Sequence, residues 1–382
     1  MKFDFIVLGA TGEQGSIASR DLLNSGYSVL LCGRDPSRIQ HILKHKKAKF
    51  SYIDVTNINN TAKVIKDSRA KIVLNCVELK YNLNVMKACL KVNVNYLDLG
   101  GLQEMTINQY KLYNAFKKRR LIALLGCGST PGIANVMAKH AVNQFNTISH
   151  IDLGFAWNSN IKKFVMPYSI ESIIYELTTP PVVLEKMKFV KTKTCEFQGL
   201  KEVKGIGKQY LYCIVHSEVY TFYKYFKHKG LKDIHYIAGF PEHSNEVLKV
   251  LMDLKLDSHD TIQINGSKIK IIDFTREVLK RIEKPKDYKE IESVWVEVIG
   301  NKNNQTKSIL ISCITETLKG FESSGSNVNT GMPISIMAQL ILINKINTTG
   351  VTSPEEAVPC KEFFNELSKR GIKIYQDGKR IN

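Results

Sequence analysis

Three glycines near the start of the chain are spaced for binding a phosphate group. Gly9, Gly12 and Gly15 follow directly on the apolar run Phe3–Leu8, and helical spacing begins at Ser16. A strand, a glycine turn and a helix let the backbone approach a pyrophosphate, which the helix N-terminus attracts. The spacing is G-x-x-G-x-x-G rather than G-x-G-x-x-G, but its position after a strand favours a dinucleotide site over an ordinary turn. The predicted cofactor contacts in this turn are Gly9, Thr11, Gly12, Glu13, Gln14 and Gly15.

The end of the second predicted strand, Ser28–Cys32, indicates which dinucleotide binds. An acidic residue near this point accepts hydrogen bonds from the ribose of NAD, whereas an Arg accommodates the 2′-phosphate of NADP. Gly33 ends the strand and Arg34 follows it, so NADP is favoured. Asp35 stands about 20 residues beyond the glycines, where the ribose-binding acid is expected, and it keeps NAD open as an alternative.

Side chains at the ends of three more predicted strands extend this site. Asp54 and Val55 follow the third strand, where Asp54 either reaches the adenine amino group or caps the next helix. Asn75 and Cys76 end the fourth strand beside the expected cofactor crevice. Asp98 ends the fifth strand, ahead of two glycines. Because ligands bind outside the carboxyl ends of parallel strands, Asp98 is a functional candidate, with a structural cap or turn as the alternative.

Two patterns of elements must position these residues. Strands alternate with helices from residue 3 to residue 125, which predicts an α/β fold with a Rossmann-type, doubly wound parallel sheet. Beyond residue 150 strand-like runs dominate, and they predict an α+β domain on a largely antiparallel sheet. We therefore expect a dinucleotide-binding domain at 1–127, completed by 330–382, and a domain at 128–329 that contributes the substrate pocket. The predicted strand-like runs are 151–157, 186–191, 209–215, 233–238, 261–265, 294–299 and 308–313.

Charge, hydropathy and cysteine usage exclude several classes of protein. The formal net charge is +18, but the basic residues are spread along the chain without interleaved aromatics, so no specific nucleic-acid partner is expected. The longest apolar stretch, Pro333–Ile343, is too short to span a bilayer, and the first residues lack the layout of a signal peptide. We therefore expect a cytoplasmic protein without a membrane partner. The eight cysteines show no C-x-x-C or paired spacing, so neither disulfides nor a metal site is predicted.

Short motifs spread along the whole chain carry a resemblance to a known family. They are Gly9–Gly15, Asn95–Gly101, Leu125–Ala134, Ser169–Val183, His216–Glu218, Gly239–His243, Thr330–Met332 and Gly350–Ala357. In this order they resemble the saccharopine dehydrogenase family of amino-acid dehydrogenases. The resemblance implies hydride transfer between NADP and the carbon–nitrogen bond of an amino or imino acid, a homodimer, and a C-terminal segment that joins the dinucleotide domain. The alternatives are a catalytically inactive NADP(H)-binding regulatory or scaffold protein, a basic nucleic-acid-binding protein whose dinucleotide fold is incidental and, as a minor rival, a lipid-associated reductase with the same G-A-T-G opening.

An enzyme of this kind needs a group for the proton of the reacting nitrogen and groups that hold carboxylates. The candidates for the proton are Asp98, His216 and Glu218, and the last two share one face of a predicted strand end. A His that merely belongs to the core or the surface is the alternative. No Arg occurs between residues 121 and 275, which leaves saccharopine in doubt and a lysine-like or other imino substrate open. The candidate substrate-binding residues are Gly128, Ser129, Thr130, Tyr168 and Ser169, of which Ser169 alternatively caps a helix.

Overall fold

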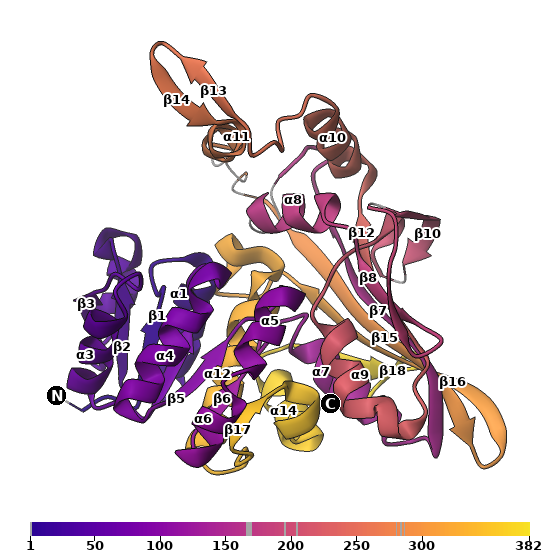
Figure 1. The fold of residues 1–382 in the computed structure, drawn as a ribbon, viewed down its shortest axis with the longest axis horizontal. Coiled ribbons are helices and arrows are strands. Elements are labelled where there is room, and N and C mark those ends of the chain that lie inside the picture. The colour runs from indigo at the N-terminus through magenta and orange to yellow at the C-terminus, as the bar shows by residue number, and fades with distance from the viewer. Residues whose placement is uncertain are drawn as a thin grey trace.

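Two β-sheets organise the chain in the computed structural model, which describes residues 2–165, 170–194, 196–203, 205–279, 281–282, 285 and 287–382. One sheet has seven strands and the other has ten. Figure 1 shows the two sheets side by side, with the indigo N-terminal unit at the left and the second sheet at the right. The predicted fold class, a parallel α/β sheet with a second sheet-based unit, is therefore confirmed.

The first sheet is parallel throughout, with the strand order β17-β6-β5-β4-β1-β2-β3. The order of the strands reverses between β1 and β4, and such a switch point opens a ligand crevice at the carboxyl ends of the strands. The cofactor turn follows β1, so it lies at this crevice. The strands are β1 (Phe5–Leu8), β2 (Val29–Gly33), β3 (Ala48–Tyr52), β4 (Ile72–Asn75), β5 (Asn95–Asp98), β6 (Ile122–Leu124) and β17 (Gly350–Thr352).

Helices cover both faces of this sheet. Ile17 of α1 belongs to one apolar core, whereas Ile65 of α3 belongs to a second one. On the first face α1 packs against α12, and on the second α3 packs against α4. The helices are α1 (Glu13–Asn24), α2 (Gln40–Leu43), α3 (Ile58–Ser68), α4 (Asn82–Val92), α5 (Gln103–Tyr110), α6 (Tyr113–Lys118) and α12 (Val328–Leu342).

The second sheet has the strand order β10-β11-β12-β7-β15-β16-β18-β19, with β8 and β9 attached at β12. Its described pairings are antiparallel except that of β12 with β7, which is parallel. Alternation along β15 turns Val294, Val296 and Val298 to the inner face, where all three are fully buried. The strands are β7 (Thr147–Ser159), β8 (Val182–Glu185), β9 (Lys188–Lys191), β10 (Glu196–Val203), β11 (Gly207–Cys213), β12 (Asp233–Phe240), β15 (Glu290–Lys302), β16 (Gln305–Glu316), β18 (Lys373–Gln376) and β19 (Lys379–Arg380).

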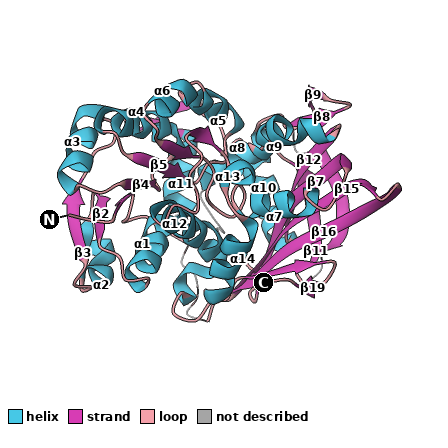
Figure 2. Cartoon of the chain, turned by 90° about the horizontal axis from the view of Figure 1, so that it is seen from below, coloured by secondary structure: helices cyan, strands magenta, loops and turns pink. Residues whose placement is uncertain are grey.

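Helices fill the space between the two sheets. Helix α7 packs on β15 and β16, α14 packs on α7, and α12 packs on α14 (Figure 2). The hairpin of β13 (Thr261–Ile264) and β14 (Ser267–Lys270) forms a separate two-stranded sheet, which projects with α11 at the top of Figure 1. The helices are α7 (Ile133–Val142), α8 (Ile170–Thr178), α9 (Glu218–Phe226), α10 (Glu242–Asp253), α11 (Ile271–Leu279), α13 (Pro354–Ala357) and α14 (Cys360–Lys369).

The C-terminal segment contributes to both sheets. Strand β17 pairs with β6 and becomes the seventh strand of the first sheet, and α12 packs against α1. Strand β18 instead pairs with β16 of the second sheet, and β19 pairs with β18. We expected residues 330–382 to complete the dinucleotide domain. Strand β17 joins that sheet, whereas the last two strands, β18 and β19, join the second sheet.

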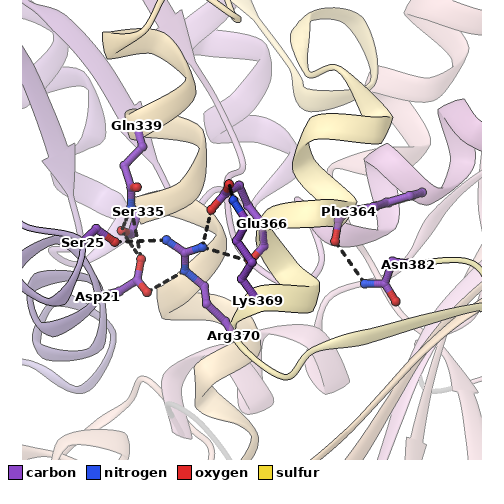
Figure 3. Close-up of polar contacts among 9 residues, drawn as sticks. All are labelled: Asp21, Ser25, Ser335, Gln339, Phe364, Glu366, Lys369, Arg370 and Asn382. Carbon is purple, nitrogen blue, oxygen red and sulfur yellow. Dashed lines mark hydrogen bonds and ion pairs between the residues drawn. The ribbon is translucent and has the colours of Figure 1, made fainter.

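A buried ion pair joins three helices on the first face of the dinucleotide sheet (Figure 3). Arg370, which follows α14, donates from Nε to Asp21 of α1 at 2.6 Å and from a terminal nitrogen to Glu366 at 2.7 Å. Ser335 and Gln339 of α12 donate to the other oxygen of Asp21 at 2.6 and 3.3 Å. The Asp21 side chain is 7% exposed and that of Arg370 10% exposed, so each charge depends on the other.

Candidate active site

The glycine turn is shaped by close approaches of the backbone. A Cβ atom at Gly9, where φ is +78°, would lie 2.6 Å from the carbonyl oxygen of Cys76, and one at Gly15 would lie 2.2 Å from that of Gly9. Larger residues therefore do not fit at these two positions. Gly12 is the N-cap of α1, and no side chain caps the helix. The first N–H groups of α1 can then serve a phosphate, so the turn fits the pyrophosphate of a dinucleotide.

The residues after β2 favour the phosphorylated cofactor. Asp35 is the N-cap of the 3₁₀ helix Pro36–Ile39, and its Oδ1 accepts from the N–H and the hydroxyl of Ser37 at 3.0 and 2.6 Å. Its carboxylate already serves a cap, which weakens the case for a ribose-binding acid. Gly33 is buried with Thr11 against it, whereas Arg34 is exposed and free to meet a 2′-phosphate.

The predicted contacts that follow β3 and those that begin α1 have different surroundings. Asp54 is exposed, and its Oδ1 accepts from the N–H and the hydroxyl of Thr56, which favours the turn over the adenine contact. The hydrogen bonds from Thr56, and more weakly the charge of Arg34, lower the pKa of Asp54 below its ordinary value. The neighbouring Val55 is buried. Glu13 and Gln14 begin α1, and the amide of Gln14 donates to Asn327 at 2.6 Å.

Asn75 and Cys76 lie at the carboxyl end of β4, beside the glycine turn. The buried Asn75 amide donates to Asn82 at 2.9 Å and to the hydroxyl of Tyr96 at 3.1 Å. Its oxygen has no hydrogen-bond partner among the described residues. Cys76 is partly exposed, and its backbone carbonyl packs closely against Gly9. Both positions border the crevice, and the Asn75 oxygen, like the side-chain oxygen of Gln14 in the turn, is a buried polar atom that a ligand could satisfy.

Asp98 has no exposed surface, and its carboxylate is occupied by protein donors. It accepts from the backbone N–H of Gly126 at 2.9 Å, Gln109 at 2.5 Å, the hydroxyl of Tyr96 at 2.8 Å and Asn82 at 3.2 Å. Burial raises the pKa of Asp98 above its ordinary value, although these hydrogen bonds act against it. The placement favours a residue that fixes the loop after β6 over the predicted proton carrier.

Four side chains from three separated segments form a connected polar group. Thr130, in the loop after β6, donates to Glu218 at 2.5 Å and lies 2.8 Å from the hydroxyl of Tyr236 on β12. The other oxygen of Glu218 is hydrogen-bonded to Nδ1 of His216. The His216 ring stacks on the Tyr236 ring, with the centroids 4.1 Å apart. The structure thus brings together the predicted residues Thr130, His216 and Glu218, and adds Tyr236.

His216 is placed to carry a proton. Its side chain is 7% exposed, and Nε2 has no hydrogen-bond partner among the described residues. A Cβ atom at Gly101 would lie 4.0 Å from this nitrogen, so the glycine leaves the space beside it open. Burial alone would lower the pKa of His216, but the charge and hydrogen bond of Glu218, together with the charge of Glu176, raise it above its ordinary value. The imidazole therefore holds its second proton more firmly than a free His does.

A second carboxylate, Glu292 on β15, was not among the sequence candidates. Its oxygens accept from the Ser129 hydroxyl at 3.1 Å and from the Asn329 amide at 3.2 Å. Burial, with the charge of Glu290, raises the pKa of Glu292 to about 7, against the hydrogen bonds. The alternation of β15 places both glutamates on the same inward face as Val294. In the sequence, Glu290 and Glu292 stand at the same alternate positions as the buried valines of this strand, and this pattern could have identified them as inward-facing acids.

The remaining predicted substrate residues have mixed outcomes. The N–H of Gly128 donates to the carbonyl of Pro131 at 2.7 Å, and that of Gly132 to the side chain of Asn135 at 2.7 Å. These two amides are used internally, and the Ser129 and Thr130 hydroxyls are bonded to Glu292 and Glu218. The N–H groups of Ser129 and Thr130 have no hydrogen-bond partner among the described residues, so they are the amides of the loop that a ligand could use. Tyr168 and Ser169 lie outside the described residues.

The glycine turn and the two carboxylates meet where the two sheets face each other. Gln14 of the turn is bonded to Asn327, which precedes α12, and Asn329 of α12 is bonded to Glu292. The cofactor turn, the loop after β6 and the inner face of the second sheet thus converge on one region. A hydride donor held at the turn would face side chains that can hold protons and positive charge.

Comparison with protein families identifies this combination. Residues 5–124 match the model of the saccharopine dehydrogenase NADP binding domain, and residues 128–372 match that of the saccharopine dehydrogenase C-terminal domain. The chain belongs to the saccharopine dehydrogenase family. This saccharopine dehydrogenase family member is an NADP-binding oxidoreductase, and the predicted family and cofactor are confirmed.

Individual relatives of this family member are distant. It is 24% identical to the carboxyaminopropylagmatine dehydrogenase of Synechocystis sp., over 96% of each chain. It is 21% identical to the carboxynorspermidine synthase of Vibrio alginolyticus, over 86% of this chain and 82% of the relative. Its fold is similar to that of apo saccharopine dehydrogenase from Saccharomyces cerevisiae, with a TM-score of 0.75, 13% identity and full coverage of both chains. Among the described residues, no helix is both long and apolar enough to cross a membrane.

Proposed function

We propose that this protein transfers a hydride between NADP(H) and the carbon–nitrogen bond of an amino acid whose secondary amine joins a carboxylate-bearing carbon to a cationic amine chain. The observation that carries the proposal is the pair of buried acids Glu218 and Glu292, bonded to the adjacent Thr130 and Ser129, in a chain with no Arg between residues 121 and 275. The two relatives, a carboxyaminopropylagmatine dehydrogenase and a carboxynorspermidine synthase, are named for compounds that fit the same chemistry.

His216 is the group proposed to manage the proton. When NADPH is bound, it supplies the hydride to the carbon of a C=N bond, and the nitrogen must gain one proton to become an amine. Protonated His216 can give that proton from Nε2, and Glu218 on Nδ1 stabilises the protonated ring. In the opposite direction, when the amine is oxidised, Nε2 of His216 removes the proton from the substrate nitrogen. Thr130 donates to the other oxygen of the Glu218 carboxylate, and Tyr236 is hydrogen-bonded to Thr130, so the pair is held in place.

The charge of the site supports a cationic substrate. Four glutamates contribute negative charge around the polar group. Their charges raise the pKa of His216, of Tyr236 or of Glu292, and the four are Glu176, Glu218, Glu290 and Glu292. Recognition of a substrate with several carboxylates calls for arginine forks, but no Arg lies between residues 121 and 275. A substrate with one carboxylate and protonated amines suits this balance better than saccharopine does. Tyr168 and Ser169 remain the proposed contacts of its carboxylate.

The test is a direct comparison of substrates with the purified full chain. NADP⁺ would be mixed separately with carboxynorspermidine, carboxyaminopropylagmatine, saccharopine and lysine, and formation of NADPH would be followed by absorbance. We expect the two amine-rich compounds to have the higher kcat/KM. Faster turnover of saccharopine would reject the proposed substrate class.

The same assay distinguishes the inactive alternative. Tight binding of NADPH in calorimetry, combined with no turnover of any of the four compounds, would favour a regulatory or scaffold protein. We further propose a homodimer, on the strength of the family resemblance. Light scattering of the purified protein measures this, and a monomeric mass would reject it.

A further inference from the structure

A cluster of two histidines and one aspartate lies on the face of the second sheet that points away from the catalytic region. His150 and Asp152 come from β7, and His235 from β12, the neighbouring parallel strand on which it stands directly opposite Asp152. Ile151, between His150 and Asp152 in the sequence, is fully buried on the inner face. Alternation therefore places the three polar side chains together on the outer face.

The three side chains point at one another. Nε2 of His150 lies 2.8 Å and Nδ1 of His235 lies 3.1 Å from the same oxygen, Oδ1 of Asp152. The three ligand atoms all lie within 4.8 Å of one another. The side chains are 23% exposed for His150, 34% for Asp152 and 33% for His235, so solvent ions can reach them.

We propose that His150, Asp152 and His235 form a binding site for a divalent transition-metal ion such as Zn²⁺. Two imidazole nitrogens and one carboxylate oxygen are a donor set used by zinc and its neighbours in the periodic table, whereas Mg²⁺ and Ca²⁺ prefer oxygen alone. In a tetrahedral zinc site with bonds near 2.0–2.1 Å, neighbouring ligand atoms stand about 3.3 Å apart. The observed separations of 2.8 and 3.1 Å need to widen by only a few tenths of an ångström to accept the ion.

The surroundings add further support for a cation. Oδ2 of Asp233 lies 4.0 Å from Nδ1 of His150, the nitrogen that would not bind the metal, and the backbone N–H of Lys186 holds the other oxygen of Asp233 at 2.8 Å. A carboxylate behind a metal-bound histidine orients the ring and increases its basicity. Glu297 on β15 stands opposite Asp152 and adds a third negative charge. Three carboxylates thus surround two imidazoles.

The site has a fixed frame and an open side. All three ligands stand on adjacent strands in the middle of a ten-stranded sheet, so their backbones are held by ladder hydrogen bonds. Three protein ligands leave a fourth position of a tetrahedral ion for water or an exogenous ligand. Tyr236, the next residue after His235, faces the opposite side and joins the polar group with Thr130. A bound ion would clamp β7 to β12 directly behind the catalytic region.

The experiment measures metal binding rather than turnover. Full-length protein without a histidine tag is freed of metal by chelation, and Zn²⁺ binding is followed by calorimetry. The variants are Asp152→Asn and His235→Gln, and the matched control is His228→Gln, since His228 is exposed in the 3₁₀ helix Lys227–Lys229. We expect one Zn²⁺ per chain, at least about tenfold weaker binding in both site variants, and no change in the control.

Two further measurements keep the result interpretable. The dissociation constant for NADPH should be the same in all four proteins, which shows that each variant is folded and separates this site from the catalytic one. Cu²⁺ bound to the unaltered protein should show coupling to two imidazole nitrogens in its electron paramagnetic resonance spectrum. Absence of stoichiometric Zn²⁺ binding, equal affinity in the site variants, or a copper spectrum without two imidazole nitrogens would overturn the proposal.

Discussion

The pairing of His216 with Glu218 makes a specific prediction about pH. Because Glu218 raises the pKa of His216, the protonated ring persists to higher pH than in a free His, and reduction of C=N should slow once pH exceeds that value. Glu218→Gln removes the charge, so the alkaline limb of kcat should shift to lower pH and kcat should fall by about a hundredfold. The pH–rate profiles of both proteins measure this, and an unshifted limb would contradict the role of His216.

The Glu292 carboxyl should make the stability of the protein depend on pH. Its pKa is raised to about 7 in the folded protein and is near 4.5 unfolded, so the native state keeps a proton that the unfolded state loses. The free energy of unfolding should therefore decline as pH rises from 4.5 to 7. Over this range the decline attributable to Glu292 is at most about 3 kcal/mol. Urea unfolding at several pH values should show a flatter profile for Glu292→Gln.

The same variant tests substrate charge. If ionised Glu292 holds a protonated amine, Glu292→Gln should raise KM for the amine by about tenfold, since a charged hydrogen bond contributes roughly 1.5–3 kcal/mol. Glu316→Gln, on the exposed end of β16, is the matched control. A KM that rises equally in both variants would mean that Glu292 does not meet the substrate.

Arg34 is the residue proposed to set the preference between the two dinucleotides. Its side chain is exposed at the end of β2, while the competing Asp35 is engaged with Ser37. Arg34→Ala should weaken NADPH binding by about 10- to 100-fold, the loss of a charge-assisted contact with the 2′-phosphate, and leave NADH binding nearly unchanged. Calorimetry with both cofactors measures the difference, with Arg119→Ala as the control, since Arg119 is exposed at the end of α6. Equal losses for NADPH and NADH would exclude this role.

Among the elements, α1, α12 and α14 meet at the buried ion pair of Arg370 with Asp21, where Arg370 is the cation. Arg370→Ala leaves the Asp21 carboxylate buried without its cation, which should cost about 3–5 kcal/mol in the free energy of unfolding. The neighbouring Lys369 offers a control, because its side chain is 69% exposed in its ion pair with Glu366. Lys369→Ala should cost less than about 1 kcal/mol. Similar losses in both variants, measured by denaturant unfolding, would show that burial does not decide the outcome.

Elements whose signal is local were predictable from the sequence. The glycine turn after Phe3–Leu8 and the alternation up to residue 125 identify a parallel sheet, because strand, turn and helix lie next to one another in the chain. The pairing of β18 with β16 was not predictable, since it joins residues more than 50 positions apart and depends on where α14 packs. The parallel pairing of β12 with β7 spans a similar distance.

The candidate site divides in the same way. His216 and Glu218 were found because they stand two residues apart in one motif. Tyr236 and Glu292 come from different strands, and only the fold brings them to Thr130 and Ser129. The cluster on the outer face was missed for this reason: its two strands place His235 opposite Asp152, 83 residues earlier in the chain. Metal-ligand spacing is readable in a sequence only when the ligands are close along it.

At the scale of the whole molecule, net charge and local charge have opposite signs. The chain carries +18, yet the region between the sheets collects buried carboxylates. The positive surface suits long-range attraction of the anionic cofactor, while the acids act only over short distances on a bound amine. One charge distribution can therefore serve two ligands of opposite sign.

The two units should unfold together. The C-terminal segment supplies β17 to one sheet and β18 to the other, and α12, α14 and α7 pack in series between them, so neither unit can lose its structure alone. Calorimetry should then show one thermal transition. NADPH at 100 times its dissociation constant should stabilise all of it by about 2.7 kcal/mol, although the glycine turn expected to hold the cofactor belongs to the first unit. Two thermal transitions, of which NADPH raises the temperature of only one, would show that the shared C-terminal segment does not couple the two units. If the segment does couple them, Arg370→Ala should separate the two transitions, because it removes the contact of Arg370, which follows α14, with α1.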